Sequence, residues 1–192
     1  AFIPKTVASL SYQLLSRGSQ YSLNAFKTEL GYNWKESIRK EHTLNPISVN
    51  YVRASFPDST TKETLFTENP ILRTSLENQF IIGSNYNYTY SNQAETNRRN
   101  NFFFNGRLET GGNVWGLFVS KDNLGKRTLF AQSLTQFVRL ETDFRDYYKV
   151  NRNVTWANRL NLGYGLAYGN TTTLPFVRQF FAGGSNDIRA FR

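Results

Sequence analysis

Apolar and polar residues alternate along seven segments of the chain, most of which run for more than ten positions. Successive side chains of a β-strand point to opposite faces, so this period of two predicts strands. Strands of soluble proteins usually have about 5 to 6 residues, whereas a tilted membrane-spanning strand needs about 9 to 11. The lengths favour membrane strands over a soluble sandwich. The predicted strands are Thr6–Ser16, Tyr21–Lys35, Thr43–Ala54, Gln79–Ser91, Asn101–Trp115, Ala131–Tyr148 and Val154–Gly169.

The alternation also separates two kinds of chemistry. In Val154–Gly169 one face carries tryptophan, leucine and tyrosine, while the other carries polar and small residues. Gln79–Ser91 repeats this division, with aromatic residues and isoleucine opposite asparagine, glycine and threonine. One face suits lipid and the other suits water. In Ala131–Tyr148 the predicted apolar face consists of Leu134, Val138, Leu140 and Phe144.

Charged residues recur on the predicted polar faces. Burying such charges in hydrocarbon or in a dry core is costly, so they require a wet interior with partners of opposite sign. We interpret them as a lumenal polar ladder of structural ion pairs and not as catalytic carboxylates. The ladder consists of Lys27, Glu29, Arg107, Glu109, Arg139, Glu141, Asp143, Arg145 and Arg159.

The connections between strands alternate in length. They are short near residues 36–42, 92–100 and 150–153, and long at 55–78, 116–130 and from 170 onward. Outer-membrane barrels place short turns on the periplasmic side and long loops outside. The chain is thus predicted to be all-β, an antiparallel transmembrane β-barrel of outer-membrane type. This threading puts a periplasmic aromatic girdle at Trp34, Tyr90, Phe102, Tyr148 and Trp156.

An open sheet would leave two long edges in lipid, where unpaired backbone groups are not tolerated. We therefore expect residues 1–192 to form a single partial barrel domain of about seven strands, closed by further strands or by another chain. Within the first long connection, Thr60–Glu63 fits a capping box that would open a short helix ending at Pro70. An irregular polar loop fits that segment equally well.

Composition narrows the chemistry. No apolar run approaches the roughly 20 residues of a membrane helix, and the absence of cysteine excludes disulfides and thiolate metal sites. His42 is the single histidine and has no nucleophile-elbow motif beside it, so no enzyme, metal or cofactor is predicted. The net charge of +9 resides largely in the short turns, which favours anionic lipid headgroups over nucleic acid.

The last predicted loop carries the most specific motif. Residues 174–192 resemble the lumen-inserted sixth loop of the BamA/TamA outer-membrane assembly factors, whose pattern is an aromatic residue, two glycines and an aliphatic-Arg-Gly-Phe tetrad. At Ala190 the family more often has glycine. The matching positions are Phe180, Gly183, Gly184, Ile188, Arg189 and Phe191, and Ala190 is the departure from the pattern.

This resemblance implies a non-enzymatic barrel that promotes folding and insertion, or translocation, of proteins at the bacterial outer membrane. It implies that Arg189 pairs with an acidic side chain of the lumen wall, for which Glu109, Glu141 and Asp143 are available. The implied partners are outer-membrane lipids including lipopolysaccharide, client outer-membrane proteins, accessory lipoproteins and the remaining barrel strands. The periplasmic POTRA domains of the family would be absent from this chain. A passive channel or transport barrel, and a relative displaying a passenger domain, remain alternatives.

Overall fold

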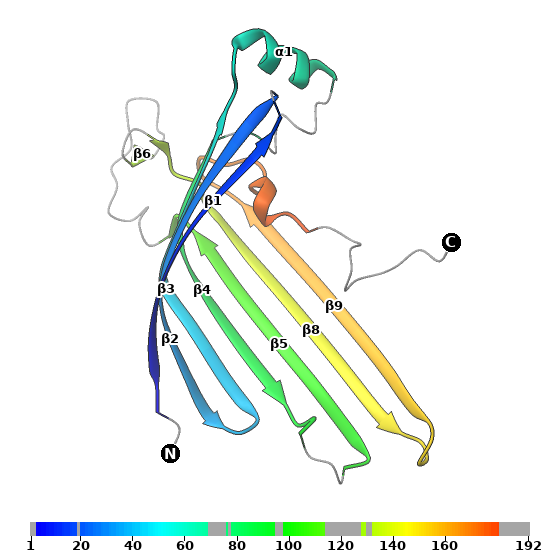
Figure 1. The fold of residues 1–192 in the computed structure, drawn as a ribbon. Helices are drawn as coiled ribbons and strands as arrows, with labels where there is room; N and C mark the ends of the chain where they lie inside the picture. The colour runs from blue at the N-terminus through cyan, green and yellow to red at the C-terminus, as the bar shows by residue number, and fades with distance from the viewer. Residues whose placement is uncertain are drawn as a thin grey trace.

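The computed structural model describes residues 3–18, 20–68, 76, 78–94, 98–113, 128–129 and 132–180 of the chain. Its main feature is one antiparallel sheet of seven strands in the order β1-β2-β3-β4-β5-β8-β9 (Figure 1). The sheet does not close on itself, so the predicted all-β partial barrel is confirmed. No helix among the described residues is long and apolar enough to span a bilayer.

The order of the strands in this sheet is the same as their order along the chain, so each long strand pairs with the next one. The strands are β1 (Lys5–Arg17), β2 (Tyr21–Ser37), β3 (Lys40–Ser55), β4 (Gln79–Ser91), β5 (Asn100–Gly111), β8 (Phe137–Lys149) and β9 (Thr155–Ala167). The remaining elements are α1 (Ser59–Glu68), the two-residue strands β6 (Thr128–Leu129) and β7 (Gln132–Ser133), and the 3₁₀ helix η1 (Phe176–Arg178).

Two predicted strand boundaries are wrong. The sixth strand was expected from Ala131, but β8 begins at Phe137, and β5 ends at Gly111 instead of continuing to Trp115. Leu134 was expected on the lipid-facing side, yet it precedes β8 and is fully buried. It lies beside Gly112, whose positive φ of 65° lets the chain leave β5. The alternation rule failed here because it was extended past the end of the paired strand.

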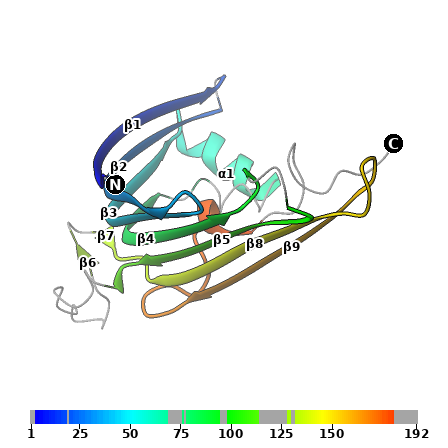
Figure 2. The same cartoon turned by 90° about the horizontal axis from the view of Figure 1, so that it is seen from below.

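The sheet curls most strongly in its first half. Figure 2 shows β1 and β2 standing over β4 to β9, with α1 and η1 on the concave side. A bulge in β3 lies within this curl, where the register shifts against both neighbours around Asn45 and Pro46. The Asn45 side chain lies over Gly31, where a Cβ would clash with it, and Ser84 Oγ donates a 2.7 Å hydrogen bond to Pro46 O. Bulges increase local twist and bend the strand.

The helix in the first long connection is real, but its cap differs from the predicted one. Helix α1 begins at Ser59, and the Asp58 carboxylate accepts a hydrogen bond from the Thr61 backbone N–H. Asp58 therefore occupies the N-cap position that the sequence pattern assigned to Thr60. This hydrogen bond lowers the pKa of Asp58 below its usual value. Pro70, the expected end of the helix, lies outside the described residues.

The convex face of the sheet is a continuous exposed apolar surface. Residues paired across an antiparallel ladder point to the same side, and most positions in the convex rows of β8 and β9 are leucine, tyrosine or other large apolar residues, with Leu10, Tyr12 and Leu14 in the convex row of β1. Their exposure is high, 71% for Leu10 and 64% for Tyr164. This division into an apolar convex face and a polar concave face is the one expected for a barrel wall in lipid.

Candidate functional site

The charged residues of the concave face form three groups of ion pairs, around Glu29, Glu109 and Asp143. Lys27 Nζ lies 3.0 Å from Glu29 Oε2 on β2, and Ser48 on β3 donates a 3.1 Å hydrogen bond to Glu29. On β8, Arg139 Nη2 lies 3.1 Å from Glu141 Oε2. All nine predicted ladder residues have at least one such partner.

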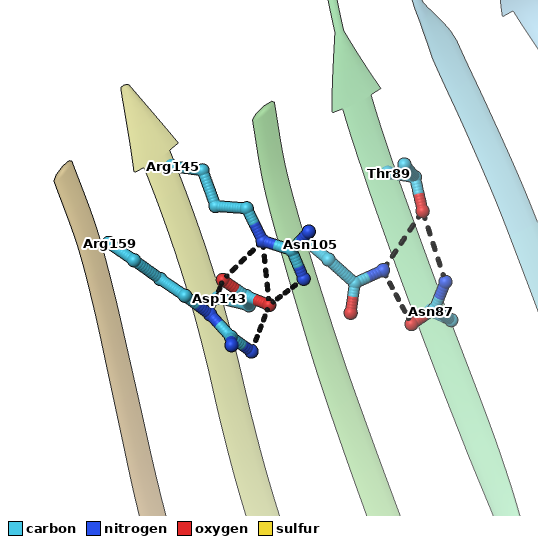
Figure 3. A network of polar contacts seen from close by, with 6 residues as sticks. All are labelled: Asn87, Thr89, Asn105, Asp143, Arg145 and Arg159. Atoms are coloured by element: carbon cyan, nitrogen blue, oxygen red, sulfur yellow. Dashed lines mark hydrogen bonds and ion pairs between the residues drawn. The ribbon is translucent and has the colours of Figure 1, made fainter. Parts of the chain in front are cut away.

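One end of this set is organised around Asp143. Arg145 of β8 and Arg159 of β9 both donate to its carboxylate, with shortest contacts of 2.6 and 2.9 Å (Figure 3). On the adjacent strands, Asn105 donates to Asn87 and to Thr89 at 3.0 and 2.9 Å. The two arginines remain about two-fifths exposed, so water reaches this end of the network.

The other end converges on Glu109 of β5, which is only 5% exposed. Arg178 of η1 places its Nε 2.7 Å from Glu109 Oε1, while Arg139 and Arg107 lie 3.8 and 4.0 Å from Oε2. Burial lowers the pKa of the Arg178 guanidinium and the Glu109 carboxylate opposes that shift. Since arginine stays protonated in proteins, this is a nearly buried carboxylate held by three cations.

Arg178 reaches Glu109 because the connection after β9 turns back over the sheet. Pro175 begins the turn, with a 2.8 Å hydrogen bond from Arg178 N to Pro175 O. Leu174 and Phe180 lie against Gly165 and Gly163 of β9, where an added Cβ would stand 2.3 and 2.5 Å from their side-chain carbons. The missing side chains of these two glycines therefore make room for the loop.

Phe180 has a second contact that joins the loop to the ladder. The Arg139 guanidinium lies 4.3 Å from the centroid of the Phe180 ring, an attractive cation–π arrangement. Residues 174–180, which we call the anchor segment, are thus attached by one ion pair, one cation–π contact and two close contacts over glycine. Two arginines, a carboxylate and a phenyl ring therefore fix this segment to the concave face.

Toward the long connections the same concave rows become apolar. Phe137 of β8 is fully buried and Ile81 of β4 is 3% exposed. Tyr21 packs with Leu65 of α1 and Leu76, which cover it. We call this part the apolar end and the ion-paired part the charged middle. The apolar end comprises Tyr21, Leu23, Val52, Ile81 and Phe137, each in the concave row of its strand by register.

The predicted girdle residues lie near the short turns that join their strands. The Tyr90 and Phe102 rings stack at 5.1 Å, and Tyr148 is paired with Trp156 across β8 and β9. Trp34 stacks on His42 at 4.9 Å, while His42 Nδ1 lies 2.7 Å from the Tyr86 hydroxyl. These contacts are typical of a histidine that packs between neighbouring strands. Within the described ranges no group of three metal-ligating side chains occurs.

The predicted loop motif itself, Gly183, Gly184, Ile188, Arg189, Ala190 and Phe191, lies outside the described residues. Glu109, Glu141 and Asp143 were candidate partners for Arg189, and each already contacts at least one arginine of the described chain. Sequence reasoning missed Arg178. Its signal was the pair Gly163 and Gly165, which leave room on the concave face of a strand just before a long connection.

The comparison with protein families gives one result that fits this architecture. The model described as the Omp85 superfamily domain matches residues 6–192, nearly the whole chain. No solved structure matches the chain significantly.

Proposed function

The chain belongs to the Omp85 superfamily, and from that premise we propose that it forms part of the barrel of an outer-membrane assembly factor similar to BamA and TamA. Members of this superfamily insert or translocate proteins at bacterial outer membranes or related organelle membranes, and they are not enzymes. In our proposal residues 1–192 are one barrel domain of the bacterial outer membrane that promotes folding of client barrel proteins.

The observation that carries the proposal is the anchor segment. It holds the connection after β9 against the concave face through the pair of Arg178 and Glu109 and through Phe180 over Gly163. The motif that begins at Gly183 follows only three residues after Phe180. This geometry supports a lumenal loop held in place beside the wall, with the polar ladder as its hydrated lining and the convex rows in lipid.

The energy for insertion comes from the folding of the client and from the bilayer, because no nucleotide is available in the outer membrane. The fixed loop would keep the barrel interior in one arrangement while client strands pair and insert. The apolar convex face and the aromatic girdle then set the depth of the barrel in lipid. Lipopolysaccharide and accessory lipoproteins are further partners in this proposal.

The test uses the full-length protein with Arg178→Ala and, separately, Arg189→Ala. We expect both variants to make the loop after Phe180 more sensitive to protease and to lower the amount of folded client proteins in the outer membrane. Arg159→Ala is the matched control, because Asp143 keeps Arg145 when Arg159 is removed. Unchanged client assembly in both loop variants would contradict the proposal.

A passive channel predicts the opposite pattern. In that case Arg178→Ala would raise the conductance of the reconstituted protein, and depletion of the protein would leave client assembly intact. Measuring both quantities on the same variants separates the two functions.

A further inference from the structure

Two neighbouring short turns form a cationic rim beside the aromatic ends of β8 and β9. The rim comprises Arg98 and Arg99 before β5, Lys149 at the end of β8 and Arg152 in the turn to β9, and all four side chains are exposed. The turns are tied together by their backbones, with Lys149 N donating to Arg99 O at 2.8 Å. Arg99 is further held over the Tyr148 ring, 5.4 Å from its centroid.

The depth of this rim follows from the convex rows. Leu140, Phe144 and Leu160 are 40 to 54% exposed on the lipid-facing side. The next row toward the short turn pairs Asp146 with Asn158, a polar row that separates the aliphatic surface from the aromatic pair of Tyr148 and Trp156. Lys149 lies three residues beyond Asp146, about 10 Å along an extended strand. That separation places the cations at the level of lipid phosphates when the apolar rows occupy the hydrocarbon.

The charge balance of the rim distinguishes it from the turn between β2 and β3. Against its four cations the rim carries Asp146 and, outside the described residues, Glu95. The other turn has Lys35, Arg39 and Lys40, but Lys35 lies 3.4 Å from Glu41 and Lys40 lies 3.2 Å from Glu36. Its net charge is +1, three cations less two carboxylates, against +2 at the rim.

We propose that the rim of Arg98, Arg99, Lys149 and Arg152 is a binding surface for the phosphate of an anionic glycerophospholipid of the leaflet that contacts the short turns. Guanidinium and ammonium groups donate to phosphate oxygens, arginine in a two-pronged geometry. Tyr148 and Trp156 lie beside these groups, and such rings favour the boundary between hydrocarbon and headgroups. The inference rests on the position of the turns in the membrane and does not require the assembly role.

The experiment measures the association of spin-labelled phosphatidylglycerol, relative to spin-labelled phosphatidylcholine, with the full-length protein in phosphatidylcholine vesicles. The rim variant is Lys149→Gln combined with Arg152→Gln. The control is Lys35→Gln combined with Lys40→Gln, which also removes two cations from one short turn. Each basic residue near a membrane surface accounts for about a fivefold factor in binding. Since the rim variant removes two such residues, we expect the relative association of phosphatidylglycerol to fall by about 25-fold in it and by less than about twofold in the control.

An equal loss in both variants, or no loss in the rim variant, would overturn the proposal. A second measurement serves if the rim variant does not fold. Raising the salt concentration with the unaltered protein should abolish the preference for phosphatidylglycerol, since exposed charges are screened, and a preference that persists in high salt would also overturn it. Client assembly is scored separately, so failure here leaves the proposed function untouched.

Discussion

The charged middle and the apolar end of the concave face belong to the same strands but are held by different forces. In the charged middle, Glu109 and Asp143 each collect two or more arginines from neighbouring elements. At the apolar end, Phe137 and Ile81 are buried, and Tyr21 packs in a core cluster with Leu65 and Leu76. The wall of this barrel is therefore wet in the middle and closed by packing near the long connections.

The difference teaches that alternation alone does not define the lining of a barrel. Both zones obey the same period of two, since Phe137 shares its face with Arg139 and Tyr21 shares its face with Lys27. What changes along the strand is coverage, because α1 and Leu76 cover the apolar end. Substitutions in the two zones should consequently destabilise the protein by different mechanisms and to different extents.

The largest loss is expected at the apolar end. Phe137→Ala removes a fully buried ring beside Gly111 and leaves a cavity, which costs about 3 to 5 kcal/mol of unfolding free energy. Urea unfolding of the full-length protein in vesicles measures this. Phe144→Ala is the control, because Phe144 is 40% exposed on the convex face. Equal losses for the two variants would mean that the apolar end is not a packed core.

The charged middle should show the next largest effect at Glu109. Glu109→Gln leaves Arg178, Arg139 and Arg107 without their shared carboxylate, and breaking such a nearly buried pair costs about 3 kcal/mol. The same unfolding measurement applies. In Glu41→Gln the altered side chain is 41% exposed, so a small change is expected. A loss at Glu109 no larger than that of the control would remove the distinction between buried and exposed pairs.

A smaller effect is expected where the loop meets β9. Gly163→Ala places a methyl group 2.5 Å from Phe180 Cε1, so the ring must move away, at a cost of about 1 kcal/mol. The loop after Phe180 should become more sensitive to protease while global unfolding changes little. Gly106→Ala adds the same methyl group on β5, where the nearest atoms belong to the Phe104 ring at 3.2 Å. Identical protease patterns in both variants would show that Phe180 is not an anchor.

The smallest effect concerns the edge of the apolar end, where Asp58 caps α1. Hydrogen bonding in the folded state lowers the pKa of Asp58, so its capping contribution is present above the ordinary carboxyl range and is lost as the pH falls through the lowered pKa. Hydrogen exchange of the α1 amides, corrected for intrinsic rates, should accelerate in acid. Asp58→Asn keeps a capping side chain that does not titrate, and it should remove this acceleration.

Most of the fold could be predicted from the sequence, because the alternation that indicates a strand lies within a single short segment. The seven long strands and the short turns follow from alternation within single segments, and Leu160, Leu162 and Tyr164 do lie exposed on one face. Errors arose where adjacent residues offered competing choices. Ile81 and Ile82 are neighbours on opposite faces, and alternation could not tell that both would be buried. Asp58 and Thr60 both suit a helix cap, and only the backbone geometry selects Asp58.

The site was less predictable because its contacts join distant parts of the chain. The polar ladder could be listed from one face of each strand, and its ion pairs follow from register. Arg178 and Glu109 are far apart in sequence, and nothing local to either residue specifies the other. The glycines at 163 and 165 were recognised as small residues of the polar face, but what fills the space beside them depends on the path of the loop.

The bulge in β3 has a consequence for how the strands find their partners. Proline has no backbone N–H, so Pro46 can stand only where the ladder is already interrupted. Asn45 fits over Gly31 on one side, and Pro46 O accepts from Ser84 on the other. Sliding β3 along β2 would lose the first match, and sliding it along β4 would lose the second. The bulge therefore fixes the register of β3 against both neighbours, so that β2, β3 and β4 have a single alignment when the sheet folds.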